Sequence, residues 1–440
     1  MWDLVVIGGG TAGLVGSQTA ASLGAKVLLV ESNRTGGECL YTGCVPSKAL
    51  LAAASAAAEV RHGSALGVDA VLKVDFNRVM DHVRAAIAHI EPVDSPEALE
   101  AAGVSMRRGR AVVTADGRVA VDGAPLSTRN VLIATGSDPV VPDIPGIGGI
   151  DVLTNDTVWN LTELPARLVV LGGGPVGCEL AQAFARLGSK VTLIQTRGRL
   201  LPREDQEAST LVMRALENDG VTVLTGISAA SIAPKESGGT LTTTAGHSVE
   251  FTHLLAGVGR VPRTSGMGLA EAGIAIDGHG HIVTDKYLRT SLAGFWASGD
   301  VTANPKFTHT AGVHASVAAA NAVVGRIRTI PAVNPRVTFT DPEVAAVGRS
   351  TKRQRTIHHT HVDRAVAQGR TEGLTRISLD RHGRIVGGTI VGPHAGETMG
   401  ELALAVHLRL KASALTGVTH AYPTYNDGLR NAAIAQTQAG

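Results

Sequence analysis

Short apolar runs flank glycine clusters at two places along the chain. Residues 4–7 are apolar and rich in β-branched side chains, and a glycine cluster, a helical stretch over 12–23 and a second apolar run over 26–30 follow them. This alternation predicts a strand–helix–strand unit. The same order recurs over 167–194. Two such units, about 165 residues apart, predict two Rossmann-like domains with parallel sheets.

The remaining segments predict other types of structure. Residues 47–99 are Ala-rich and mostly helical in pattern, and 112–126 read as short strands with glycine turns. The chain changes character at Pro335. Beyond it we expect strands and one amphipathic helix, at 337–339, 375–379, 385–391 and 396–410. The fold class is therefore α/β, with two Rossmann-like dinucleotide-binding domains and a C-terminal α+β domain.

Composition excludes several classes of function. The chain has 440 residues, which suggests about three domains, and its net charge of +2 gives no nucleic-acid-sized basic field. Aromatic residues are only 3%, which argues against stacking on single-stranded nucleic acid. No apolar run reaches the ~20 residues of a membrane span, and the first is too short for a signal peptide. We expect a cytoplasmic protein without a nucleic-acid or membrane partner.

The first glycine cluster has the spacing Gly8-x-Gly10-x-x-Gly13, between a strand and a helix. Glycines there permit a tight turn and the close approach of a pyrophosphate, which then lies at the positive helix N-terminus. Glu31 ends the second strand, where a carboxylate accepts hydrogen bonds from a ribose. This combination predicts a dinucleotide site; the alternative is an ordinary glycine-rich turn.

A second fingerprint has glycines at the same spacing, at Gly172, Gly174 and Gly177. Gln195, rather than an acid, stands at the end of the following strand, and Arg197 and Arg199 come soon after it. An arginine there neutralises a 2′-phosphate that a carboxylate would repel. The pattern favours NADPH over NADH, although these arginines also fit a solvated loop.

Two of the three cysteines, Cys39 and Cys44, are five positions apart at the start of a probable helix, within the stretch 36–48. One helical turn with a slight distortion brings such sulfurs within disulfide range. The helix N-terminus and nearby Lys48 lower a thiolate pKa. Three cysteines do not make a secreted disulfide framework, so a close pair indicates redox chemistry or a metal. No second Cys/His pair at suitable spacing supports zinc, and we expect no metal site.

The chain resembles the FAD-dependent pyridine nucleotide-disulfide oxidoreductases of the glutathione reductase, dihydrolipoamide dehydrogenase and mercuric reductase type. The resemblance covers essentially the whole chain, in the motifs at 36–48, 134–136, 297–300 and 339–342. It implies an FAD-binding domain over 1–150 and 263–331, an NAD(P)-binding domain over 151–262, and a dimerisation domain over 332–440. It also implies a homodimer with shared active sites.

The resemblance implies roles for individual residues. Cys44 is the thiol nearest the flavin, and Cys39 is the interchange thiol that meets the substrate. Lys48 pairs with Glu179 beside the isoalloxazine, where a fixed ammonium stabilises the negative charge that hydride transfer leaves. Asp300 binds the ribityl chain and Glu31 the adenosine ribose. Further cofactor contacts are expected at Thr135, Gly136, Gly259 and Thr308.

The chain departs from the family pattern at the base that services the interchange thiol. Tyr422 stands where disulfide-reducing members carry a histidine, and Asp427 replaces the glutamate that orients it. A phenol with a pKa near ~10 is a poor base at neutral pH. His420 is an alternative base, or else a hydrogen-bonded interface histidine. The histidines at 358, 359 and 361 are expected in a solvated loop, and Cys178 as a packing residue.

These features predict an NAD(P)H:acceptor oxidoreductase that passes electrons through FAD and the Cys39/Cys44 disulfide to a small acceptor. The acceptor is an unusual disulfide, a quinone or a metal ion, because Tyr422 replaces the base. One alternative is the dihydrolipoamide dehydrogenase subunit of a 2-oxo acid complex. A mercuric reductase-like enzyme is another, although residues 436–440 lack the expected terminal cysteine pair. A flavin-bearing protein without turnover is a third.

Overall fold

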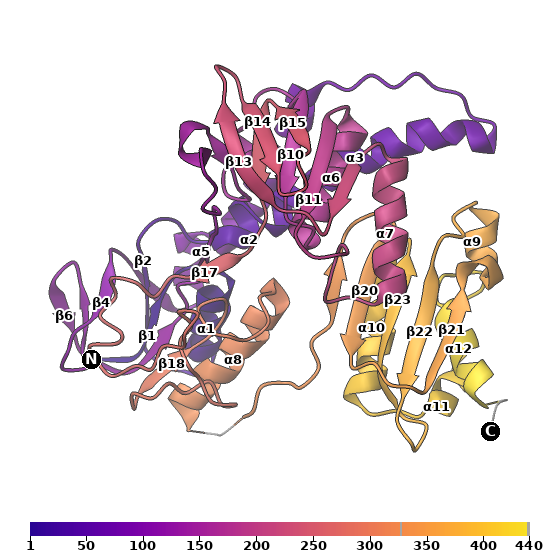
Figure 1. The fold of residues 1–440 in the computed structure, drawn as a ribbon. Helices are drawn as coiled ribbons and strands as arrows, with labels where there is room; N and C mark the ends of the chain where they lie inside the picture. The colour runs from indigo at the N-terminus through magenta and orange to yellow at the C-terminus, as the bar shows by residue number, and fades with distance from the viewer. Residues whose placement is uncertain (326–327, 438–440) are drawn as a thin grey trace.

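The computed structural model describes residues 1–325 and 328–437 (Figure 1). Its first sheet has five parallel strands in the order β18-β7-β1-β2-β3. The central strand β1 is buried from Leu4 to Ile7, as expected of a parallel sheet covered on both faces. Helices α1 and α8 pack against each other beside this sheet. The elements are β1 (Trp2–Ile7), β2 (Val27–Glu31), β3 (Val104–Arg108), β7 (Thr128–Ile133), β18 (Phe295–Ala297), α1 (Thr11–Ser22) and α8 (Thr308–Val324).

The second sheet repeats this plan, in the strand order β12-β11-β10-β16-β9, again parallel. An antiparallel sheet of β13, β14 and β15 lies beside it (Figure 1). Both strand–helix–strand units predicted from the sequence are therefore present. The elements are β9 (Val152–Leu153), β10 (Arg167–Leu171), α6 (Pro175–Leu187), β11 (Lys190–Gln195), α7 (Gln206–Asn218), β12 (Thr222–Thr225), β13 (Ala229–Pro234), β14 (Gly239–Thr243), β15 (Ser248–Phe251) and β16 (His253–Ala256).

Two crossover strands join the parts of the chain that hold these sheets. Strand β8 (Ser137–Pro139) leaves the first sheet, β17 (Arg260–Pro262) returns to it, and the two pair antiparallel. A small antiparallel sheet of β4 (Ala111–Val113), β5 (Val119–Val121) and β6 (Ala124–Leu126) matches the predicted short strands. The crossover places residues of both Rossmann-like parts next to each other.

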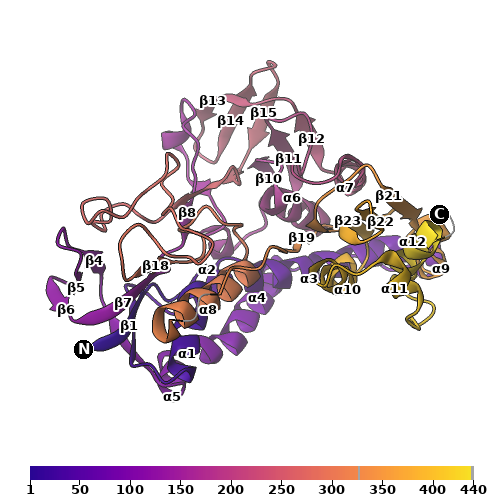
Figure 2. The ribbon, with the colours of Figure 1, turned by 90° about the horizontal axis from the view of Figure 1, so that it is seen from below.

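Helices fill the segment between β2 and β3, and in Figure 2 α3 and α4 lie side by side and extend toward the C-terminal part of the chain. Helix α3 packs on both α4 and α6, so it ties this segment to the second sheet. The expectation that residues 47–99 are mostly helical is confirmed; the main interruption is residues 67–75, which have no helix or strand. The helices are α2 (Gly37–Tyr41), α3 (Cys44–His62), α4 (Phe76–Ile90) and α5 (Pro96–Ala101).

The C-terminal part is an antiparallel sheet in the order β19-β20-β23-β22-β21, with helices against it. This is the predicted α+β domain. Helix α10 is shorter than expected, because Arg409 has a positive φ of 54° just after it. The elements are β19 (Arg336–Thr338), β20 (Glu343–Gly348), β21 (Gln354–His358), α9 (Asp363–Ala367), β22 (Leu374–Leu379), β23 (Ile385–Gly392), α10 (Ala395–His407), α11 (Ala412–Thr416) and α12 (Asp427–Thr437).

Within residues 1–325 and 328–437, no helix combines the length and the apolar character that a membrane span requires. Residues 326–327 and 438–440, which belong to the expected first and third domains, lie outside the described residues.

The turn from β1 to α1 depends on backbone contact that only glycine allows. A Cβ on Gly13 would lie 1.7 Å from the carbonyl oxygen of Gly8, whereas a Cβ on Gly10 would meet only the Cα of Gly37, at 3.9 Å. We expect Gly13→Ala to lower the free energy of unfolding by about 1–3 kcal/mol. Gly10→Ala, the matched control, should cost less than about 1 kcal/mol. Urea unfolding followed by circular dichroism measures the stability of both variants. Equal losses of stability would contradict the close contact proposed at Gly13.

Candidate active site

The β1–α1 turn presents free backbone donors. Gly10 is the N-cap of α1 and provides no side-chain acceptor, so the first N–H groups of the helix face outward. The carboxylate of Glu31 fixes this turn, since its Oε2 accepts from the Gly9 N–H at 2.6 Å and its Oε1 from the Asn33 N–H at 2.7 Å. These donors and this tight turn fit a bound pyrophosphate.

The second turn repeats the arrangement with a neutral side chain. Gly174 caps α6 without a side-chain acceptor, and Gln195 Oε1 accepts from the Gly173 N–H at 3.2 Å. Arg199 is engaged locally, because its Nη2 donates to the carbonyl of Pro202 at 2.8 Å. Arg197 is exposed. Of the two arginines predicted to meet a 2′-phosphate, Arg197 is therefore the more accessible.

The cysteine pair lies across a break between two helices, not at the start of one. Helix α2 ends at Tyr41, and α3 begins at Cys44. The prediction of a single distorted turn is corrected by Gly43, whose φ of −124° and ψ of −107° leave the helical range. Both thiols are free, and Cys44 Sγ lies 3.1 Å from the hydroxyl of Thr308.

The two thiols have opposite acid–base character. The hydrogen bond from Cys39 lowers the pKa of Cys44 to about 6, aided by Thr308 and the charge of Lys48 and opposed by burial. The same contact with Cys44, followed by burial, raises the pKa of Cys39 well above its ordinary value. Thr11 at the start of α1 is a further hydrogen-bond partner of Cys39. In the reduced pair, Cys44 is the thiolate and Cys39 keeps its proton.

Lys48, one turn along α3 from Cys44, forms an ion pair with Glu179 of α6 at 2.8 Å. The second oxygen of Glu179 accepts from the backbone N–H of Phe339 at 2.9 Å, and Lys48 Nζ lies 4.1 Å from the centre of the Phe339 ring. The start of the C-terminal domain thus fixes the pair. Sequence reasoning missed Phe339, although its motif was noted.

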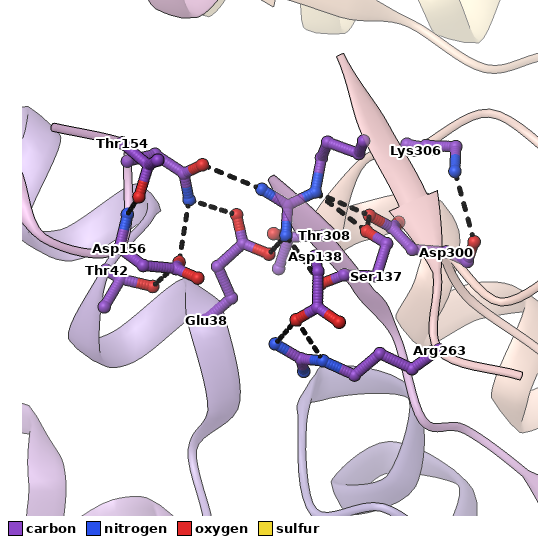
Figure 3. Close-up of polar contacts among 12 residues, drawn as sticks. Glu38, Thr42, Ser137, Asp138, Thr154, Asp156, Arg263, Asp300, Lys306 and Thr308 are labelled. Carbon is purple, nitrogen blue, oxygen red and sulfur yellow. Dashed lines mark hydrogen bonds and ion pairs between the residues drawn. The ribbon is translucent and has the colours of Figure 1, made fainter. Parts of the chain in front are cut away.

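A polar network joins the predicted ribityl-binding acid to the cysteine helix (Figure 3). Asp300 Oδ2 accepts from the hydroxyl of Ser137 at 2.8 Å, and the guanidinium of Arg260 bonds both Ser137 and Glu38. Glu38 and Arg260 were not predicted, although both stand inside motifs, one residue before Cys39 and one after Gly259.

The other predicted cofactor residues lie near this network. Thr135 Oγ1 donates to the Arg263 carbonyl at 2.8 Å. Two glycines that were predicted to contact the cofactor have positive φ values, Gly136 at 73° and Gly259 at 145°.

Tyr422 is held by a carboxylate that the sequence did not indicate. Its hydroxyl donates to Asp363 Oδ2 at 2.6 Å, which raises the pKa of the phenol. Asp427, expected to orient this residue, instead accepts from the Thr424 N–H at 3.1 Å at the start of α12. The correction has a local cause, because a carboxylate at a helix N-terminus satisfies free N–H groups. Tyr422 is 71% exposed.

His420 does not offer a free ring nitrogen. Its Nε2 lies 2.8 Å from Glu401 Oε1 and its Nδ1 lies 3.0 Å from the Val418 carbonyl, with 6% of the side chain exposed. Two acceptors face the ring, so it serves as a structural hydrogen-bond donor. This geometry matches the alternative of a hydrogen-bonded histidine.

The contacts of the other histidines and of Cys178 give these residues structural roles. His359 is fully buried, with Nε2 3.1 Å from the Thr375 hydroxyl, so the predicted solvated loop is wrong for this residue. His309 Nε2 contacts the Pro335 carbonyl at 2.8 Å. Cys178 is buried, as expected of a packing residue, and burial raises the pKa of its thiol. No cluster of three or more His, Cys, Asp or Glu suited to a metal occurs in the described part of the chain.

Comparison with known proteins identifies the class. Residues 2–315 match the family model described as "Pyridine nucleotide-disulphide oxidoreductase", and residues 334–433 match its dimerisation domain. The chain belongs to the pyridine nucleotide-disulphide oxidoreductase family. It is therefore an NAD(P)H-dependent flavoprotein disulfide oxidoreductase, for which FAD and a pyridine nucleotide are the cofactors.

Relatives with different substrates are similarly close. A mercuric reductase from Streptomyces lividans is 35% identical, covering 98% of this chain and 95% of that protein. A dihydrolipoyl dehydrogenase from Thermus scotoductus is 34% identical, covering 99% and 97%. The Cu(II) complex of the HOCl-induced flavoprotein disulfide reductase RclA from Escherichia coli superposes with a TM-score of 0.87 at 25% identity, covering 99% of both chains. The comparisons show the family and do not separate these substrates.

The thiolate state of Cys44 can be measured directly. In the reduced protein we expect alkylation of Cys44 by iodoacetamide to rise through a pH of about 6, because the thiolate is the nucleophile. Thr308→Val should move this midpoint upward, since it removes a hydrogen bond to the thiolate. Thr310→Val is the control on the same helix. Peptide mass spectrometry locates the label; modification of Cys178 in the native protein, or an unchanged midpoint in Thr308→Val, would contradict the assignment.

Proposed function

We propose that this protein is an NAD(P)H:acceptor oxidoreductase that works through a Cys39/Cys44 redox disulfide. The observation that carries the proposal is the pair of free thiols, Cys39 on α2 and Cys44 at the start of α3, with Cys44 Sγ 3.1 Å from the hydroxyl of Thr308. Their contact lowers the pKa of Cys44 and raises that of Cys39. Such polarisation suits disulfide exchange, in which a thiolate is the nucleophile or the leaving group. We assign FAD binding to 1–150 and 263–331, NAD(P) binding to 151–262 and dimerisation to 332–440.

The residues of the first Rossmann-like part fit FAD. The open β1–α1 turn and the uncapped start of α1 suit its pyrophosphate, and Glu31 and Asp300 supply carboxylates for its hydroxyl groups. Bound FAD supplies the hydride-accepting chemistry that joins NAD(P)H to a disulfide. The Lys48–Glu179 pair orients a fixed positive charge beside Cys44, where developing negative charge is stabilised.

The electron and proton balance is simple at the cysteines. Two electrons from NAD(P)H break the Cys39–Cys44 disulfide, which leaves Cys44 as the thiolate and Cys39 as the thiol after uptake of one proton. Reduction of the acceptor by two electrons then returns the pair to the disulfide, and the Cys39 proton leaves to the acceptor or to solvent. Cys44 keeps its negative charge through contacts with Cys39, Thr308 and Lys48.

We infer the class of acceptor from Tyr422, which replaces the histidine base of disulfide-reducing family members. The hydroxyl of Tyr422 donates to Asp363, which keeps the phenol protonated and makes it a weak proton acceptor. This favours acceptors that need no base at Cys39, such as a quinone, a reducible metal ion or an unusual disulfide. Lipoamide, the substrate class that the dihydrolipoyl dehydrogenase relatives suggest, fits this arrangement less well.

A homodimer follows from the family and from the exposure of the terminal segment. Residues 334–433 match a dimerisation domain. In the family the segment around Tyr422 lies over the cysteine pair of the partner, and here the phenol is 71% exposed in the single chain. We propose that each active site is completed by the Tyr422 of a second copy.

Restoring an imidazole tests the acceptor assignment. We expect the wild-type enzyme to reduce quinones or metal ions with NADPH but lipoamide only slowly. Tyr422→His should raise lipoamide reduction by about 10²-fold, the usual scale of general acid–base catalysis. Stopped-flow oxidation of NADPH with a panel of acceptors measures both.

Two controls accompany this test. Tyr422→Phe removes the hydroxyl without adding a base and should leave lipoamide reduction low. Cys39→Ser should abolish reduction of every acceptor that uses the dithiol. Rapid lipoamide turnover by the wild-type enzyme would reject the acceptor proposal, and full acceptor turnover by Cys39→Ser would reject the dithiol mechanism itself.

The preference for NADPH is proposed to depend on Arg197. Arg197 is exposed just after β11, and Gln195 at the end of that strand adds no negative charge beside the second turn. Arg197→Ala should raise the KM for NADPH about tenfold, equivalent to about 1.4 kcal/mol, and leave the KM for NADH unchanged. Arg214→Ala, an exposed arginine on α7, is the control. Equal losses with both nucleotides would show that Arg197 does not read the 2′-phosphate.

A further inference from the structure

Glu38 lies between the first glycine-rich turn and the cysteine pair. Its helix, α2, packs directly on that turn, since a Cβ on Gly37 would lie 2.5 Å from the Cα of Gly10, and the Gly36 N–H donates to the Gly9 carbonyl at 3.0 Å. The residue after Glu38 is Cys39. A carboxylate at this position is therefore near both the proposed FAD turn and the redox centre.

One guanidinium holds this carboxylate. Arg260 Nη2 donates to Glu38 Oε2, and Asn155 Nδ2 donates to the other oxygen at 3.0 Å. Arg260 also donates to the hydroxyl and the carbonyl of Ser137, each at 2.8 Å, and lies 3.7 Å from Asp300 Oδ2. Figure 3 shows the carboxylates of Glu38 and Asp300 approaching the same guanidinium from two sides.

Charges of both signs act on Glu38. The carboxylates of Asp300 and Asp156 both disfavour its ionised form, and Arg263, the other nearby arginine, is committed to Asp138 at 2.6 Å. Burial is the largest effect and raises the pKa of Glu38 to about 7, although the charge of Arg260 opposes the rise. The charged groups that act on Glu38 are Asp156 after β9, Arg260 and Arg263 at β17, and Asp300 after β18. Cys39 follows it on α2, Asp138 on β8 pairs with Arg263, and Lys306 contacts the Asp300 carbonyl.

We propose that Glu38 is a proton-linked positioning residue, which takes up one proton from solvent when FAD binds and so leaves Arg260 to Asp300. An anionic dinucleotide adds negative charge at the adjacent turn and excludes water from side chains that remain 36% exposed at Glu38 and 22% exposed at Asp300. Both effects favour the neutral carboxyl. The inference rests on the proposed placement of FAD at the first turn.

Linkage sets the direction of the pH dependence. Below a pH of about 7 Glu38 already carries its proton, so FAD binds without proton uptake. Above that pH the free protein must acquire the proton on binding, and the Kd for FAD should rise by up to about tenfold per pH unit. Arg260, shared by two carboxylates in the free protein, then serves Asp300 alone.

Proton uptake on FAD binding tests the proposal. Flavin-free full-length protein is mixed with FAD in weak buffer that contains a pH indicator. We expect about one proton per FAD at about pH 8, and well under half of one at about pH 5.5. Glu38→Gln should remove the uptake at pH 8 and flatten the pH dependence of the Kd. Glu236→Gln, an exposed carboxylate in the β13–β14 turn, is the matched control and should behave as wild type.

Each outcome of this experiment supports or rejects the proposal. Absence of proton uptake by the wild-type protein at pH 8 overturns the proposal without any variant, and so does full uptake by Glu38→Gln. Glu38→Thr replaces Glu38→Gln if the latter does not fold, since it also removes the titrating group. A protein that binds no FAD at all would instead reject the proposed function, which separates the two failures.

Discussion

The contact between α2 and the β1–α1 turn is the constraint on which the site depends. Gly37 has a φ of 58°, and a Cβ on it would lie 2.5 Å from the Cα of Gly10, so only glycine fits at position 37. This close approach brings Cys39 beside Thr11 at the start of α1. The glycine-rich turn and the segment that carries Cys39 are therefore in direct backbone contact, and a shift in one displaces the other.

The proton chemistry of the pair is divided between two parts of the molecule. Within the first part, contacts at Thr308 and Lys48 keep Cys44 ionised. In the C-terminal domain, Tyr422 donates a hydrogen bond to Asp363 and His420 contacts Glu401. The contacts of Cys44 are thus local, whereas the groups that we propose to act on Cys39 lie in a separate domain.

The sequence was sufficient for features that local patterns encode. Apolar runs around Gly8 and Gly172 predicted both strand–helix–strand units, and the resemblance to a known family implied the Lys48–Glu179 pairing. Features that depend on distant partners were missed. Asp363 lies 59 positions from Tyr422, and Arg260 lies 222 positions from Glu38. A single sequence has no signal for such pairs. The break before Cys44 was missed because Gly43 resembles a helix residue in periodicity and differs only in its dihedral angles.

The two glycine-rich turns are fixed by the same kind of hydrogen bond, but from side chains of different charge. Glu31 and Gln195 occupy the same position after their strands, and each accepts a hydrogen bond from the second glycine of its turn. The structural task needs only an oxygen acceptor, which a neutral amide supplies as well as a carboxylate does. The charge is therefore free to vary with the ligand. A carboxylate suits a ribose hydroxyl at the first turn, whereas the neutral amide at the second removes a repulsion that a 2′-phosphate would otherwise meet.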